Sequence, residues 1–170
     1  LSKEFNSIKY YIAIGRLTSQ KNFNFLIDSF SKIHGELKIK NLIILGEGEQ
    51  KVLLENLIKR YKMEKYIHLI GYKDNPYKYI YNSEALISTS NYEDPGFVIY
   101  ESIFLNKAII SSNCDNGPKE LNEYVKKGFF FQKDNITDFK EKILEFEKEN
   151  NFQLKLRMKK FSKNFTIFSH

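Results

Sequence analysis

Cysteine and long apolar runs are scarce in this chain of 170 residues. The single cysteine, Cys114, excludes an intrachain disulfide and is typical of a reducing compartment. Every apolar run is far shorter than the roughly 20 residues that a membrane-spanning helix needs. The first residues show no signal-peptide pattern and do not begin with Met, so we expect a cytoplasmic piece of a longer protein.

Several motifs of common binding sites are also missing. The sequence has no Asp-x-Asp pair, which leaves a divalent metal held by clustered carboxylates without support, and no Gly-x-x-x-x-Gly-Lys-Ser/Thr loop. The turn at Gly46 begins like a dinucleotide fingerprint, but Lys51 stands where the third glycine belongs. The histidines are scattered, and we expect neither His34 nor His68 to be catalytic or a ligand. We therefore expect no metal and no cofactor.

Positive charge is in excess but is not concentrated. The formal net charge is +6, and basic residues cluster only at Lys126–Lys127 and between Arg157 and Lys160. A nucleic-acid interface normally gathers its charge on one face, so nucleic acid is not an expected partner. A basic soluble surface, a phosphorylated small molecule and weak attraction to an anionic membrane stay open.

Short apolar segments, rich in aromatic and β-branched residues, predict strands. Most of them end at glycine or at a polar turn. The predicted strands are Tyr10–Ile14, Asn41–Leu45, Ile67–Ile70, Ala85–Ser88, Ala108–Ser111 and Phe129–Phe131.

Segments with helical spacing of apolar residues alternate with these strands. The predicted helices cover Phe23–Ile33, Leu53–Tyr61, Pro76–Tyr81, Gly96–Leu105, a segment from about Pro118, Ile136–Phe146 and a last basic helix, Phe152–Lys163. This alternation predicts one α/β, Rossmann-like domain over residues 1–150, with about six parallel strands and helices on both faces. Residues 151–170 would form the separate basic helix.

Ligands of such sheets bind beyond the carboxyl ends of the strands, where the strand order reverses. The segment Glu93–Glu101 follows a predicted strand and opens a helix. The free N–H groups of Gly96, Phe97 and Val98 would favour an anion, and both carboxylates would reach the same cleft. The alternative is one carboxylate beside a helix dipole and one solvated helical carboxylate.

Two cations follow the first strand. Gly15 allows a sharp exit, and Arg16 and Lys21 would project over the same cleft. An Arg fork and a Lys point charge suit a diphosphate, although solvated loop cations are the commoner case. A further helix start, Gly117–Glu120, is expected to be structural, with contact to a ligand left open.

Four segments, each at a predicted strand end and in this order, resemble family 4 glycosyltransferases, also called glycosyltransferase group 1. They are Ile14–Leu17 with Gln20–Asn22, Gly71–Tyr77, Glu93 and Glu101 with seven residues between them, and Asn113–Glu120. The second and fourth are similar to the branch that builds bacterial surface polysaccharide and lipopolysaccharide. The resemblance covers residues 10 to 165 and is to the C-terminal, donor-binding half of the two-domain GT-B fold.

The resemblance implies a retaining transfer of a hexosyl group from a UDP- or GDP-sugar to a hydroxyl, without a metal. Arg16 and Lys21 would clamp the diphosphate, Glu101 the ribose and Glu93 the sugar. The Gly96, Phe97 and Val98 amides would meet sugar or phosphate, and the backbone of Tyr72 would lie near the base. The leaving phosphate would itself take the acceptor proton.

The family also implies an N-terminal acceptor domain that this chain lacks, and a last helix that crosses back to that domain. The acceptor would be a precursor of lipopolysaccharide, O-antigen or capsule at the inner face of the bacterial inner membrane. Asp94 departs from the family pattern, in which glycine commonly follows the first Glu. A non-catalytic nucleotide-binding module and a basic membrane-surface module remain the alternative functions.

Overall fold

One parallel sheet organises the protein. The computed structural model describes residues 8–37, 40–125 and 129–149. The sheet consists of β1 (Tyr10–Ile14), β2 (Asn41–Leu45), β3 (Ile67–Leu69), β4 (Ala85–Ser88), β5 (Ala108–Ser112) and β6 (Phe129–Phe131). The strands lie in the order β3-β2-β1-β4-β5-β6, and every neighbouring pair is parallel. The predicted α/β class and strand number are confirmed.

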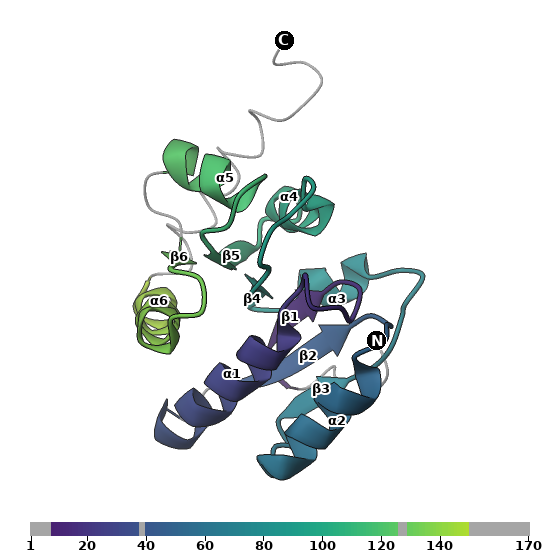
Figure 1. Ribbon diagram of the computed structural model, residues 1–170. Coiled ribbons are helices and arrows are strands. Elements are labelled where there is room, and N and C mark those ends of the chain that lie inside the picture. Colours follow the sequence, from purple (N-terminus) through teal and green to yellow (C-terminus); the bar gives the residue numbers. More distant parts are fainter. Residues whose placement is uncertain (1–7, 38–39, 126–128, 150–170) are drawn as a thin grey trace.

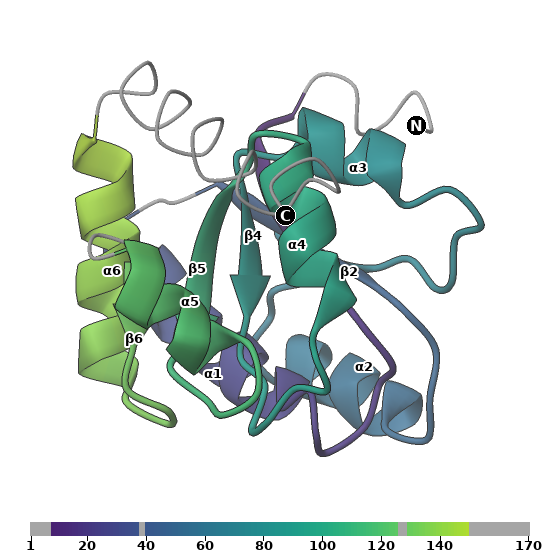
Figure 2. The same cartoon turned by 90° about the horizontal axis from the view of Figure 1, so that it is seen from above.

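A helix follows each strand. The helices are α1 (Phe23–Leu37), α2 (Lys51–Arg60), α3 (Tyr77–Asn82), α4 (Phe97–Phe104), α5 (Pro118–Val125) and α6 (Ile136–Lys148). In Figure 1, α6, α1 and α2 lie below the sheet, whereas α5, α4 and α3 lie above it. Figure 2 shows the same two layers from above. Helices on both faces bury the central strands completely, which explains why these strands read as continuous apolar runs.

Small differences from the predicted boundaries have causes that the structure shows. β3 ends at Leu69, before Ile70, because Gly71 turns the backbone with a φ of 73°. β5 includes Ser112, since this residue is in register with Phe131 of β6. The helix α6 runs on to Lys148. The predicted basic helix Phe152–Lys163 lies outside the described residues.

The strand order reverses between β1 and β4. From β1 the chain builds outward through β2 and β3, and from β4 it builds the other way through β5 and β6. The loops that leave β1 and β4 therefore diverge from the carboxyl edge of two adjacent strands. Such a switch point is where open α/β sheets bind ligands.

Candidate functional site

The loop after β1 is fixed by backbone contacts with the loop after β2. The Leu17 N–H donates to the Glu47 carbonyl over 2.9 Å, and the Gln50 N–H donates to the Leu17 carbonyl over 3.1 Å. A Cβ atom on Gly46 would lie 1.9 Å from the Gly15 carbonyl oxygen. Only glycine fits at position 46, so the Gly46 turn supports the neighbouring loop.

The other end of this loop is clamped to the exit of β4. The Thr89 hydroxyl donates to the Lys21 and Asn22 carbonyls over 3.0 and 3.2 Å. The Asn91 N–H donates to the Gln20 carbonyl over 2.8 Å. The two loops at the switch point thus form one hydrogen-bonded unit, which holds the side chains between them in defined positions.

Lys21 and Glu93 pair across these loops. Lys21 Nζ lies 2.6 Å from Glu93 Oε2, and the two side chains are 19% and 5% exposed. A Cβ atom on Gly15 would approach three carbons of the Lys21 stem to 3.0 Å. The missing side chain at Gly15 therefore gives the Lys21 stem room to lie over the strand end and reach Glu93.

Among the described residues, Glu93 is the only buried one that carries a charged side chain. Its second carboxylate oxygen, Oε1, accepts a hydrogen bond from Ser90 Oγ over 2.5 Å. Each oxygen thus has a partner, which offsets the cost of removing a carboxylate from water. Its backbone N–H donates to the Asp115 carbonyl over 3.2 Å, so the loop after β5 also supports this segment.

A cleft of about 580 Å³ opens above the pair. Its walls include Arg16, Lys21, Glu93, Gly96 and Phe97. Gly96 precedes α4 with a φ of 76°, and no side chain caps this helix. The first N–H groups of a helix have no partner within it, so the start of α4 presents donors and a positive dipole end to an anion.

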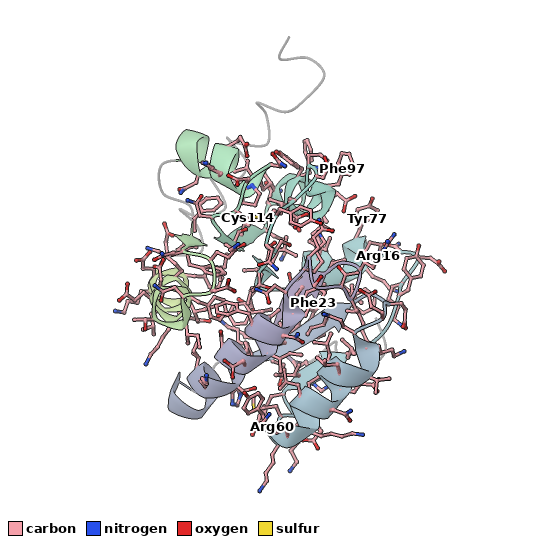
Figure 3. The ribbon with its side chains drawn as sticks, in the orientation of Figure 1. Arg16, Phe23, Arg60, Tyr77, Phe97 and Cys114 are labelled. Atoms are coloured by element: carbon pink, nitrogen blue, oxygen red, sulfur yellow. The ribbon has the colours of Figure 1, made fainter. Side chains whose placement is uncertain are left out.

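A second cleft, of about 560 Å³, adjoins the first. It is lined by Gly15, Arg16, Tyr72 and Tyr77, together with aliphatic side chains from the ends of β1 and β2. Arg16 is exposed and lines both clefts, so it stands at their junction. In Figure 3, Arg16, Tyr77 and Phe97 lie on one side of the molecule, whereas Arg60 lies at its lower end.

The structure brings most of the predicted site residues together. Arg16, Lys21, Glu93, Gly96 and Phe97 share the first cleft, and Gly15, Arg16 and Tyr72 share the second.

The remaining two residues lie on α4 without lining either cleft. Val98 is half-buried and packs against the core. Glu101 is half-buried, and its Oε1 lies 3.4 Å from the hydroxyl of Tyr77, which borders the second cleft. Glu101 therefore stands beside the second cleft, while Glu93 belongs to the first.

Two contacts of the site were missed at the sequence level. Lys21, which is predicted to project over the cleft toward a diphosphate, also pairs with Glu93, 72 positions further along the chain. Ser90 is not among the predicted site residues. It ends a polar run, Ser88–Ser90, at the carboxyl end of an apolar strand, which is the place where such sheets bind ligands. Spacing alone could have drawn attention to Ser90 but not to the Lys21 pairing.

Cys114 lines neither of the two clefts. Cys114 is buried next to Ser112, and burial raises the pKa of its thiol. Over the described ranges, no three His, Cys, Asp or Glu side chains lie close enough to hold a metal ion. The same part of the chain contains no helix of the length and apolarity needed to cross a bilayer.

The family model for glycosyl transferases group 1 matches residues 2–165. The chain belongs to this family. An uncharacterized glycosyltransferase of Methanocaldococcus jannaschii is 37% identical over 111 residues, which make up 65% of this chain and 27% of that protein. A Campylobacter jejuni enzyme, N-acetylgalactosamine-N,N'-diacetylbacillosaminyl-diphospho-undecaprenol 4-alpha-N-acetylgalactosaminyltransferase, is 34% identical over 113 residues, or 66% of this chain and 30% of that one.

Solved structures agree with this assignment. A Staphylococcus aureus TarM variant, crystallised with fondaparinux, α-GlcNAc-glycerol and UDP, matches with a TM-score of 0.83 at 25% identity. The match covers 95% of this chain and 33% of TarM. The chain thus spans about a third or less of each of these three proteins, and its fold is that of one α/β domain of a GT-B glycosyltransferase.

Proposed function

We propose that this chain is the donor-binding half of a retaining glycosyltransferase. It would hold a nucleoside-diphosphate hexose while the hexosyl group passes to a hydroxyl of a lipopolysaccharide, O-antigen or capsule precursor. The acceptor would be held by an N-terminal domain outside this chain. The observation that carries the proposal is the place of Arg16, at the junction of two clefts on the switch-point edge of the sheet.

The two clefts suit the two ends of such a donor. The second cleft has aromatic and aliphatic walls at Ile14, Leu45, Tyr72 and Tyr77, which suit a nucleoside. The first cleft combines cations, a carboxylate and a helix start, which suit phosphates and sugar hydroxyls. A donor lying across both clefts would pass its diphosphate by Arg16.

The charges support this orientation. Lys21 has three donor hydrogens, of which Glu93 accepts one, so the ammonium can serve a phosphate and the carboxylate together. Arg16 and Lys21 would offset the charge on the leaving diphosphate, whose oxygen would accept the proton of the attacking hydroxyl. Glu93 would accept hydrogen bonds from sugar hydroxyls, and Glu101, beside Tyr77, from the ribose.

Two further expectations belong to this proposal. No residue role in it calls for a metal ion, since the cations Arg16 and Lys21 would do the charge balancing. The protein would work in the cytoplasm, at the inner face of the membrane where such precursors are assembled.

Calorimetric titration with UDP, GDP and ADP tests the proposal, on the full-length protein and on its Arg16→Ala variant. We expect one nucleotide to bind, with UDP as the first candidate because the TarM complex contains it. Loss of a hydrogen bond to a charged group costs about 1.5–3 kcal/mol, so Arg16→Ala should weaken binding about 10- to 100-fold. Arg60→Ala, at an exposed arginine away from both clefts, is the matched control.

Comparing the two variants distinguishes a specific nucleotide site from non-specific attraction of the nucleotide by positive charge. Equal losses in Arg16→Ala and Arg60→Ala would mean that general basicity attracts the nucleotide. No binding by the full-length protein, even at millimolar nucleotide, would end the donor-binding assignment.

A further inference from the structure

Ser90 lies directly beneath the carboxylate of Glu93. It follows β4, is only 1% exposed, and donates its hydroxyl hydrogen to Glu93 Oε1 over 2.5 Å. Lys21 approaches the other oxygen from the opposite loop. The carboxylate is therefore held at both oxygens, by a neutral donor from the sheet end and a cation from the β1–α1 loop.

The position of Ser90 is itself fixed from below. Ser112 Oγ, at the end of β5, donates to the Ser90 carbonyl over 2.7 Å. Ser88 Oγ lies 3.4 Å from Ser90 Oγ. All three serines are buried, so the contact with Glu93 originates in the rigid end of two adjacent strands rather than in a mobile loop.

The hydrogen bonds that Lys21 and Ser90 make to Glu93 would respond differently to a bound donor. Lys21 lines the first cleft and is available to phosphate, so its hydrogen bond to the Glu93 carboxylate would change when a diphosphate enters. Ser90 is buried and does not line that cleft. Of the two hydrogen bonds to the Glu93 carboxylate that the described residues make, the one from Ser90 is therefore the one that an entering diphosphate does not compete for.

We propose that Ser90 is a positioning residue that orients Glu93 toward the donor sugar. This inference rests on the proposed function, in which Glu93 meets the sugar. Ser90 acts only through Oε1 of Glu93. It affects the part of binding and transfer that depends on the sugar, and leaves the hold on the nucleotide unchanged.

The test uses Ser90→Ala in the full-length protein, with UDP-N-acetylglucosamine and UDP-glucose as donor probes and UDP as the nucleotide probe. Small misplacements of a positioning group cost on the order of 10- to 100-fold, and we expect this loss in kcat for transfer or donor hydrolysis. The Kd for UDP should stay within about twofold. Ser90→Thr, which keeps the hydroxyl, should recover most of the rate.

Ser29→Ala is the matched control. Ser29 is a fully buried serine on α1 whose hydroxyl has no hydrogen-bond partner among the described residues. Its removal should change neither kcat nor the Kd for UDP. Thermal unfolding of all variants separates a loss of folded protein from a loss of rate.

A double-mutant cycle with Glu93→Ala, which removes the oxygen that accepts the Ser90 hydrogen bond, decides whether Ser90 acts through Glu93. We expect Ser90→Ala to cost little more once Glu93 is already Ala. An equal loss in both backgrounds overturns the proposal, as does an unchanged kcat in Ser90→Ala.

A crystal structure of the Ser90→Ala protein gives a readout that does not need activity. We expect the Glu93 carboxylate, then held by Lys21 at Oε2 alone, to rotate so that Oε1 leaves its present place, and an unmoved Oε1 overturns the inference. A wild-type protein that binds no UDP counts against the proposed function instead, and the crystal structure still decides the role of Ser90.

Discussion

Removing the charge of Lys21 is the most informative change to the free protein. The Lys21–Glu93 pair ties the loop after β1 to the segment after β4, and the Glu93 side chain is only 5% exposed. Lys21→Met keeps an unbranched stem in the space over Gly15 but removes the ammonium. The buried carboxylate then keeps Ser90 as its neutral partner and loses its counter-charge.

The size of the effect follows from this burial. Breaking a buried ion pair by removing one partner costs about 3–5 kcal/mol, because the other charge stays buried without compensation. Lys21 is 19% exposed, so water replaces part of the lost interaction, and we place the cost near the lower end, at about 3 kcal/mol. Replacing both partners costs less, so Lys21→Met/Glu93→Gln should recover about 1–2 kcal/mol of this loss.

Urea unfolding followed by circular dichroism measures the change. With a slope of about 2 kcal/mol per M, a loss of 3 kcal/mol lowers the midpoint by about 1.5 M. Lys32→Met is the control, since Lys32 forms an exposed pair with Asp28 one helical turn away. Water screens such a pair, so the midpoint of Lys32→Met should hardly differ from that of the wild type.

Two results would refute this reasoning. Equal midpoints for Lys21→Met and Lys32→Met would mean that water satisfies Glu93 as well as Lys21 does. A double variant less stable than Lys21→Met would mean that Glu93 stabilises the fold through contacts other than this pair.

Two further predictions concern the fold. Gly46→Ala should destabilise the protein by about 3 kcal/mol or more, because its Cβ would meet the Gly15 carbonyl at 1.9 Å. Gly35→Ala should raise the free energy of unfolding by about 0.5–1 kcal/mol, because Gly35 lies in a helix and an added Cβ atom would meet no neighbouring atom within 4 Å. Thermal unfolding measures both variants, and melting temperatures that shift in the same direction contradict the packing argument. His34 should make stability depend on pH, because burial lowers the pKa of its imidazole from 6.5. Its contribution is present above pH 6.5 and is lost as the pH falls through the lowered folded pKa, so urea midpoints between pH 7.5 and 5 should fall less steeply in His34→Gln than in wild type.

Much of the fold could be predicted from the sequence because strands that are buried on both faces of a sheet consist mainly of apolar residues. Segments such as Asn41–Leu45 and Ala85–Ser88 have an apolar centre and one polar end, and both are strands with those same ends. One boundary error falls where a distant partner decides, because Ser112 joins β5 through its pairing with Phe131 of β6. Periodicity carries no information about such a partner.

The site was less predictable than the fold. Residue types after each strand indicated which loops carry charge, and the loops after β1 and β4 do meet at one edge. The sequence could not indicate that Lys21 and Glu93 pair, since that depends on the absent side chain of Gly15. Nor could spacing alone separate Glu93, which lines the first cleft from the segment before α4, from Glu101, which lies on α4 beside Tyr77 and the second cleft.

Different segments of the chain line the two clefts at the switch point, and this has a consequence for how substitutions change the ligand that is bound. The second cleft is lined by the ends of β1 and β2 and by the segment after β3, whereas the first lies between the loop after β1 and the segment after β4. The two clefts meet at Arg16 and at the loop that carries it. We expect the nucleoside and the sugar to be selected by separate stretches of sequence, so that exchanging residues 70–77 alters the preferred base while the preferred sugar stays the same.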